Sequence, residues 1–210
     1  MLAILLEEDS PEAETALRRW GAAVEGAQRR SRVGRALLRG MLGTATGLAA
    51  EEWRIVTEAS GRPVAVTGKD TPGPSVSLSH SGGWVAAAVC AVGTVGIDVE
   101  AHRPSRNFAG IARFAFGPEE CARAAAGPDE FYRIWTLREA VAKATSVGIT
   151  QVADRKDRVA EGPGEGAWTA DIEGRRWFLF HKAPHPALNL ALAVRDWASP
   201  AAEPDWWSVG

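Results

Sequence analysis

The feature that most constrains this chain is the alternation of apolar and acidic residues in segment 95–100, Val-Gly-Ile-Asp-Val-Glu. Successive side chains of a β-strand point to opposite faces, so Asp98 and Glu100 leave the same face of a strand. The apolar residues, Val95, Ile97 and Val99, occupy the other face and predict contact with a core. A strand that ends in a solvated acidic pair is an equally good interpretation of the spacing alone.

A second acidic segment, 135–143 (Trp-Thr-Leu-Arg-Glu-Ala-Val-Ala-Lys), has helical spacing. Glu139 and Lys143 are four residues apart and are neighbours on a helix. Glu139 falls at the edge of an apolar arc that includes Trp135, so its carboxylate is partly sheltered. An ordinary surface Glu–Lys pair explains the spacing as well. Together, Asp98, Glu100, Glu139 and Lys143 suit Mg²⁺ and a pyrophosphate, because Mg²⁺ takes oxygen ligands and shares its shell with substrate phosphates.

Composition narrows the class of protein. The chain has 210 residues, 46% hydrophobic and 24% charged, as in a globular protein with a real core. A net charge of −2 argues against a broad nucleic-acid or membrane-surface role. The apolar start has no basic region and no long hydrophobic run, so it does not resemble a signal peptide. Cys90 and Cys121 form no disulfide framework or metal motif, and we expect a cytoplasmic protein.

The order of predicted elements indicates an α+β protein with two similar halves. We expect helices, antiparallel strands, further helices and further antiparallel strands, over these residues: helices 11–20, 28–47, 118–126 and 128–147; strands 2–6, 64–66, 75–78, 84–91, 94–99, 167–172, 176–181 and 188–194. The pair 84–91 and 94–99, with a turn at Val92-Gly93, is the clearest predicted hairpin. The halves are 1–101 and 102–199, followed by a loosely ordered tail, 200–210.

Several further residues are candidates for phosphate contacts. Ser79 and His80 precede two glycines that break a strand, where exposed side chains can approach phosphate oxygens. Arg32, Arg35 and Arg62 can bind phosphate groups with two hydrogen bonds each. A surface turn and a solvated helix flank explain the same residues without a ligand. Another arginine, Arg138, points into the apolar arc of its helix and either extends along packed side chains or binds a phosphate or a loop.

Five segments, taken in order, resemble the 4′-phosphopantetheinyl transferase family, and the surfactin-synthetase-activating, single-chain type is the most similar. They are the basic helix, Gly-Arg-Pro, Ser-Leu-Ser-His-Ser, Gly-Ile-Asp-Val-Glu and Trp-x-x-Arg-Glu-Ala-x-x-Lys, within residues 30–150. The family usually has Lys where this chain has Arg138. The resemblance implies two α+β halves related by a pseudo-twofold axis, with the active site in the cleft between them, in a monomer.

The resemblance also implies an activity, that of a holo-[acyl-carrier-protein] synthase. Such enzymes transfer 4′-phosphopantetheine from coenzyme A to a serine of an apo acyl or peptidyl carrier protein and release 3′,5′-ADP. Asp98, Glu100 and Glu139 would hold Mg²⁺, or Mn²⁺ in its place. The catalytic residues would be Glu139, Lys143 and Asp98, with Glu139 as the candidate base.

Other residues would bind the two substrates. Coenzyme A would contact Lys143 and five candidate phosphate-binding residues of the first half. These are Arg32, Arg35, Arg62, Ser79 and His80. An acidic helix of the carrier protein would meet Arg103, Arg106 and Arg113, for which a solvated linker is an equal alternative. Neither nucleic acid nor membrane is an expected partner.

Two other functions remain open at this point. A Mg²⁺-dependent phosphotransferase acting on another substrate would use the same carboxylates, although no Walker-type glycine loop is present. A catalytically weak module that binds coenzyme A or a carrier protein would explain the substitution at Arg138. The carrier proteins served, and the tolerance for acylated coenzyme A, are not determined by the sequence.

Overall fold

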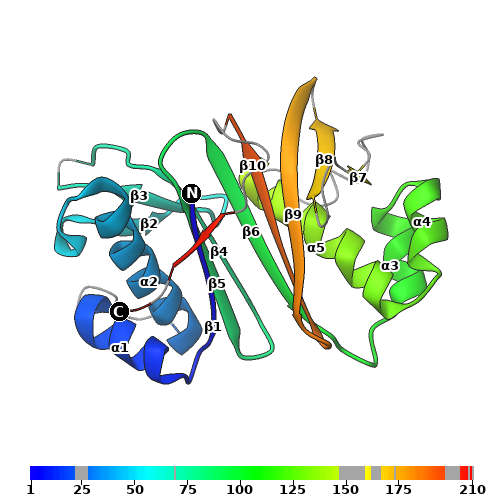
Figure 1. Ribbon diagram of the computed structural model, residues 1–210, viewed down its shortest axis with the longest axis horizontal. Helices are drawn as coiled ribbons and strands as arrows, with labels where there is room; N and C mark the ends of the chain where they lie inside the picture. The colour runs from blue at the N-terminus through cyan, green and yellow to red at the C-terminus, as the bar shows by residue number, and fades with distance from the viewer. Residues whose placement is uncertain are drawn as a thin grey trace. The chain divides into compact units, whose positions relative to one another are not determined.

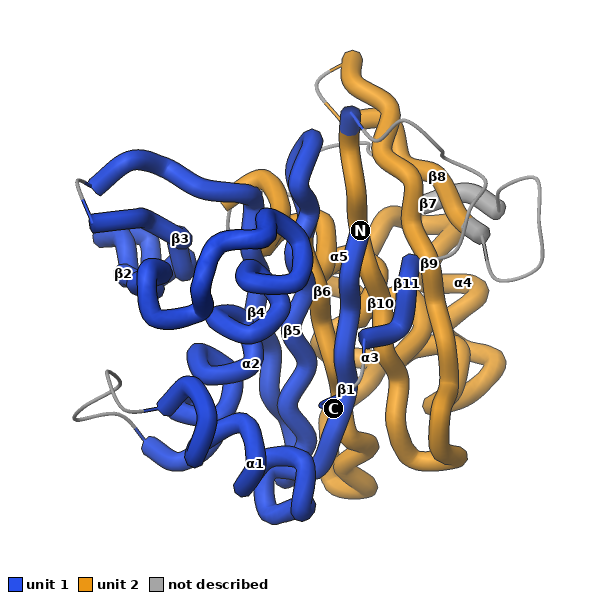
Figure 2. The backbone as a smooth tube through the Cα atoms, turned by 60° about the vertical axis from the view of Figure 1, so that its left-hand side comes forward, with its two compact units in different colours: residues 1–95, 196–210 blue, residues 96–195 orange. Residues whose placement is uncertain are grey.

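The computed structural model describes residues 1–21, 28–68, 70–146, 159–161, 167–172, 174–196, 204–207 and 209. The chain divides into two compact units, residues 1–95 with 196–210, and residues 96–195 (Figure 2). Each is a mixture of helices and β-strands, so the α+β class is confirmed in its coarse form. The predicted boundaries at 101/102 and 199/200, and the pseudo-twofold relation between halves, stay predictions.

The two α-helices of the first unit match their predicted bounds to within one residue. Helix α1 (Pro11–Trp20) starts after Ser10, whose side chain accepts a hydrogen bond from the Ala13 amide at 3.2 Å. Helix α2 (Arg29–Thr46) ends at Gly47, which takes a left-handed conformation with φ 75°. A short 3₁₀ helix, η2 (Ala50–Glu52), follows. One face of α2 is fully buried, and its apolar side chains form a large part of the core of this unit.

The first unit contains a four-stranded sheet in the order β11-β1-β5-β4 and a separate hairpin, β2-β3. The strands are β1 (Leu2–Glu7), β2 (Arg54–Thr57), β3 (Pro63–Val66), β4 (Ser75–Ser81), β5 (Trp84–Cys90) and β11 (Asp205–Trp206). Helix α2 packs on the sheet, as Figure 1 shows. The predicted strands 2–6, 64–66 and 84–91 are confirmed, and β2 was not predicted.

The predicted hairpin between 84–91 and 94–99 is wrong. Strand β5 lies between β1 and β4, while β6 (Thr94–Ala101) belongs to the second sheet. The true hairpin joins β4 to β5 through Gly82 and Gly83, whose φ angles of 57° and 86° suit a tight turn that other residues rarely adopt. Strand β4 therefore continues to Ser81 and does not break at Ser79.

The second unit is a five-stranded sheet in the order β6-β10-β9-β8-β7, with helices α3, α4 and α5. Its other elements are β7 (Val159–Glu161), β8 (Ala167–Ile172), β9 (Arg175–His185), β10 (Leu188–Arg195), α3 (Phe108–Ala115), α4 (Pro118–Ala124) and α5 (Pro128–Thr145). The predicted strands β8 to β10 and their antiparallel pairing are confirmed. Helix α3 was not predicted.

Helix α5 packs against this sheet and forms one core with β8, β9 and β10. It ends at Thr145, before the predicted stop, because Ser146 takes a left-handed φ of 59°. The predicted end of this helix at residue 147 lies outside the described residues. Gly96 lets β6 approach α5 closely, since a Cβ at Gly96 would lie 2.0 Å from the Ala140 carbonyl oxygen.

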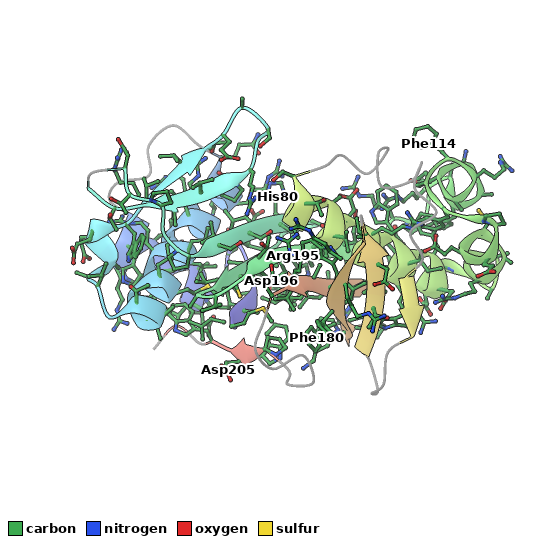
Figure 3. The ribbon with its side chains drawn as sticks, turned by 90° about the horizontal axis from the view of Figure 1, so that it is seen from above. His80, Phe114, Phe180, Arg195, Asp196 and Asp205 are labelled. Carbon is green, nitrogen blue, oxygen red and sulfur yellow. The ribbon has the colours of Figure 1, made fainter. Side chains whose placement is uncertain are left out.

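The end of the chain departs from the predicted loose tail. Strand β11 pairs in parallel with β1, with Leu2 opposite Asp205 (Figure 3 labels Asp205). Trp207 packs against Trp20, with ring centroids 5.5 Å apart, and its indole N–H donates to Thr44 Oγ1 at 3.2 Å. Within the described part of the chain, no helix is long and apolar enough to cross a membrane.

Candidate active site

Asp98 lies on the buried side of β6 and meets Lys143 of α5. The Lys143 Nζ is 2.6 Å from Asp98 Oδ1, and the Asp98 side chain is only 5% exposed. Gly96, Asp98 and Glu100 alternate along β6, and Gly96 faces α5 at Ala140. The alternation therefore places both acidic side chains toward the helix that carries Glu139.

Glu100 is held through both of its carboxylate oxygens. The Trp135 indole Nε1 donates to Oε1 at 2.8 Å, and Arg106 Nη1 donates to Oε2 at 3.3 Å. Both Arg106 and Glu100 keep 17% of their side-chain surface exposed. Neither donor was predicted for this role, although Trp135 lies one helical turn before Glu139, and this spacing is the signal that could have indicated it.

Glu139 lies in the electrostatic field of these groups. Burial raises its pKa from about 4.5 to about 7, and the negative charges of Asp98 and Glu100 add to the increase. Lys143 and Arg106 act in the opposite direction. Three carboxylates and two cations are thus coupled within one unit, and the pKa of Glu139 lies close to neutral pH.

The structure decides between the two predictions for Arg138. Its side chain is 2% exposed and donates from Nε and Nη2 to Glu120 Oε2, at 3.0 and 2.6 Å. The same Glu120 oxygen accepts from the Gly117 amide at 3.1 Å, at the start of α4. Arg138 therefore binds a neighbouring segment: it joins α5 to α4 through a buried ion pair.

The loop after β6 is fixed by a chain of polar contacts that the sequence did not indicate. Asn189 Nδ2 donates to His102 Nε2 at 2.6 Å, and Asn189 Oδ1 accepts from His181 Nε2 at 2.7 Å. His102 also stacks on Tyr132, with ring centroids 4.1 Å apart. Burial lowers the pKa of both histidines, which favours their neutral forms.

The predicted residues of the first unit are spread over α2 and the strands. Arg32 is exposed on α2, and Arg35 Nη2 donates to Thr57 Oγ1 of β2 at 2.8 Å. Arg62 precedes β3 and donates from Nη2 to Ser75 Oγ at 3.4 Å. A fourth arginine, Arg39, also lies on α2. Its side chain is buried and donates to the carbonyls of Ala50 and Trp20, so its role is structural.

Ser79 and His80 are successive residues of β4 and therefore point to opposite faces. Ser79 is 6% exposed, whereas His80, labelled in Figure 3, is exposed. The prediction of exposed hydroxyls beside the glycine turn is wrong for Ser79, because β4 continues through it with strand alternation. The imidazole of His80 is accessible to a ligand.

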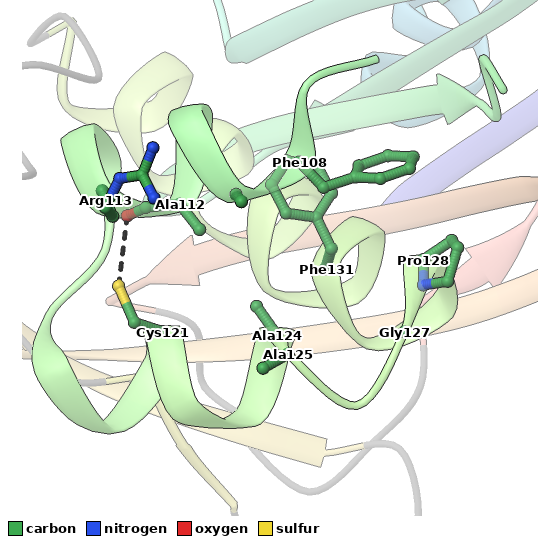
Figure 4. A pocket seen from close by; sticks show the side chains of 10 residues that line it. Phe108, Ala112, Arg113, Cys121, Ala124, Ala125, Gly127, Pro128 and Phe131 are labelled. Carbon is green, nitrogen blue, oxygen red and sulfur yellow. Dashed lines mark hydrogen bonds between the residues drawn. The ribbon is translucent and has the colours of Figure 1, made fainter. Parts of the chain in front are cut away.

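A pocket of about 450 Å³ opens between α3, α4 and the start of α5 (Figure 4). Its lining is mainly apolar and includes Phe108, Ala112, Phe131 and the thiol of Cys121, with Arg113 also contributing. Phe114, next to Arg113, is 70% exposed and extends outward from α3 in Figure 3. An apolar pocket next to an exposed aromatic side chain is typical of an interaction surface.

Among the residues with described side chains, no three His, Cys, Asp or Glu side chains are already arranged to hold a metal ion. The second unit nevertheless brings together Asp98, Lys143, Glu100 and Glu139 through hydrogen bonds or charge. Their predicted roles as metal ligands and catalytic groups stay predictions.

Comparison with known proteins matches residues 94–195 to the model of the 4′-phosphopantetheinyl transferase superfamily. The chain is 30% identical over 185 residues to the 4′-phosphopantetheinyl transferase HetI of Nostoc sp., covering 86% of this chain and 75% of that protein. The chain belongs to the 4′-phosphopantetheinyl transferase superfamily.

Two further relatives match shorter parts. The 4′-phosphopantetheinyl transferase psf-1 of Bacillus pumilus is 33% identical over 127 residues, 58% of this chain and 52% of that protein. The 4′-phosphopantetheinyl transferase AcpT of Escherichia coli K12 is 40% identical over 72 residues, 32% of this chain and 37% of that protein. This member of the superfamily is therefore an enzyme of the phosphopantetheinyl transferase class, and the span matched by the family model contains Asp98, Glu100, Glu139 and Lys143.

Proposed function

We propose that this phosphopantetheinyl transferase moves the 4′-phosphopantetheine group of coenzyme A to a serine of an apo acyl or peptidyl carrier protein, releasing 3′,5′-ADP. The observation that carries the proposal is the coupled cluster of Asp98, Glu100, Glu139 and Lys143 within the span that the family model matches. Carboxylates for a cation, and an ammonium for phosphate, are the groups that such a transfer needs.

The donor set fits Mg²⁺, with Mn²⁺ as an alternative. Asp98, Glu100 and Glu139 offer hard oxygen ligands, and burial, together with the negative charges of Asp98 and Glu100, raises the pKa of Glu139. A bound divalent cation would offset the repulsion among the three carboxylates. When bound, the ion would neutralise charge on the pyrophosphate during the transfer.

The residues of the chain would handle the proton and the phosphate. Glu139, directly or through a water molecule, would take the proton of the carrier serine as the serine oxygen attacks the β-phosphorus of coenzyme A. The bond from that phosphorus to the departing 3′,5′-ADP oxygen then breaks. Lys143 would contact the pyrophosphate and stabilise the charge that develops on its oxygens.

In this proposal, coenzyme A also contacts residues of the first unit. Arg32, Arg35, Arg62 and His80 present basic or hydrogen-bonding side chains suited to its phosphates. The buried hydroxyl of Ser79 needs a local change before it can take part. Their assignment is supported by the order of the family motifs in the sequence.

The carrier protein would dock on the surface of the second unit that includes α3. Residues 101–118 contain three arginines, Arg103, Arg106 and Arg113, and no acidic residue. This charge complements the acidic helix of a carrier protein. The exposed Phe114 and the pocket between α3 and α4 offer an apolar contact beside those charges. We assign Arg103 and Arg113 to this surface, because Arg106 contacts Glu100.

The resemblance supports the surfactin-synthetase-activating type, the pseudo-twofold relation between halves and the monomeric state. The cysteine usage supports a cytoplasmic location. The alternative of a weak binding module loses its support from Arg138, because that side chain pairs with Glu120 within the fold.

Intact mass spectrometry of an apo carrier protein, incubated with this protein, coenzyme A and Mg²⁺, tests the proposal. We expect the carrier to gain the mass of one phosphopantetheine, and Glu139→Gln or a chelator to abolish the gain. Glu51→Gln, at an exposed position of η2, should retain activity. No gain with fatty-acid, polyketide and nonribosomal-peptide carriers would contradict the proposed function.

A further inference from the structure

Arg106 has an unusual environment for a loop arginine. Its guanidinium donates to Glu100 Oε2 at 3.3 Å and lies over a row of aromatic rings from α5. The guanidinium carbon is 4.7 Å from the Trp135 ring centroid, 5.4 Å from that of Tyr132 and 5.7 Å from that of Phe131. The aromatic row can hold this cation whether or not a carboxylate accompanies it.

The two strand carboxylates are each paired with a cation of the same unit. Lys143 is paired with Asp98, and Arg106 with Glu100, while both cations also favour the charged form of Glu139. A divalent cation among these carboxylates would stand close to the Arg106 guanidinium. Like charges repel strongly in partly buried surroundings, so the ion and Arg106 compete for Glu100.

We propose that Arg106 is a positioning residue that holds Glu100 as a counter-cation in the metal-free protein and releases it when a divalent cation binds. The inference rests on the proposed function, because it takes Glu100 as part of a metal site. Trp135 keeps its hydrogen bond to Glu100 Oε1 throughout, so the carboxylate stays oriented while its other oxygen becomes available. The released guanidinium remains on the aromatic row.

Arg106 would thereby connect the loop beside the proposed carrier surface to the metal site. Its backbone amide donates to Arg103 O at 3.1 Å, and its carbonyl accepts from the Phe108 amide, two residues after Arg106. Movement of the Arg106 side chain would therefore occur next to the start of α3, because Arg106 lies between Arg103 and Phe108 in the sequence.

Mn²⁺ affinity of the full chain, measured by electron paramagnetic resonance without coenzyme A, tests the proposal. We expect Arg106→Met to bind Mn²⁺ about three- to tenfold more tightly than the wild type, because a competing charge is lost. Arg106→Lys keeps the charge and should bind as the wild type does. Arg176→Met removes an exposed arginine paired with Asp171 and should change nothing.

Arg106→Gln offers a second neutral variant that can still donate a hydrogen bond, and it should also bind Mn²⁺ more tightly. In the wild type, Mn²⁺ should accelerate modification of Arg106 by phenylglyoxal, followed by peptide mass spectrometry. Unchanged or weaker Mn²⁺ binding in both neutral variants, or unchanged modification, would overturn the proposal. Failure of the wild type to bind Mn²⁺ at all would instead count against the metal site of the proposed function.

Discussion

At the scale of single residues, Glu139 shows how burial and charge set the behaviour of one side chain. Its pKa in the folded protein is about 7, above the ordinary value of 4.5, chiefly because burial disfavours the charged form. The folded state therefore binds this proton more tightly than the unfolded state does. The resulting stabilisation is complete below about pH 4.5 and is lost as the pH rises through 7.

The direction of this pH dependence gives a prediction for the stability of Glu139→Gln in the metal-free protein. The variant mimics the protonated side chain, so its free energy of unfolding should match the wild type near about pH 4 and exceed it by up to about 3 kcal/mol near about pH 8. Urea unfolding in chelator at both pH values measures the difference. Mg²⁺ at the higher pH should reduce it, because a bound ion stabilises the wild type. A difference independent of pH would contradict this account.

At the scale of elements, the distance between β6 and α5 decides whether the carboxylates meet. Gly96→Ala would place a methyl group 2.0 Å from the Ala140 carbonyl oxygen and 2.6 Å from the Ala144 amide nitrogen, and both are backbone atoms of a helix. We expect a loss of about 3 kcal/mol in unfolding free energy, together with weaker metal binding, because β6 must move away from α5.

Chemical denaturation and Mn²⁺ titration measure these two effects. Gly68→Ala is the matched control, since a Cβ there meets nothing within 4 Å. It should change the unfolding free energy by less than about 0.5 kcal/mol. Equal stabilities for the two variants would show that β6 and α5 do not need the close approach.

The elements also show which parts of the fold the sequence could predict. Ser10 and Pro11 mark the start of α1 through local chemistry, and the structure confirms this start. Gly47 ends α2 in a left-handed conformation, at the limit of the predicted helix 28–47. Pairing of strands depends on distant residues, so local alternation could not show that β5 joins β1 and β4. The role of Arg138 depended on Glu120, which lies in another helix, and spacing within α5 could not reveal it.

At the scale of the whole molecule, the sequence could predict which candidate site residues share a face when those residues are close together in the sequence. The spacing of Asp98 and Glu100, and of Glu139 and Lys143, placed each pair on one face of its element. The partners of Glu100 were not predicted, because Arg106 acts from a loop and Trp135 was interpreted as core. Hydrogen-bond partners from different elements require the folded arrangement.

The chain end gives a prediction for the first unit as a whole. The last residues follow the second unit in sequence, yet β11 completes the first sheet and Trp207 packs on Trp20 and Thr44. Trp207→Ala removes a half-buried ring and a hydrogen bond, so we expect the unfolding free energy of this unit to fall by about 2 kcal/mol.

Tryptophan fluorescence and circular dichroism during urea unfolding measure this loss. Trp206→Ala is the control, because the neighbouring side chain is 39% exposed and its replacement should cost less than half as much. No loss in either variant would indicate that β11 stabilises the first unit through its backbone pairing with β1 alone. A larger loss for Trp207 would show that the ring acts as the apolar anchor of the chain end.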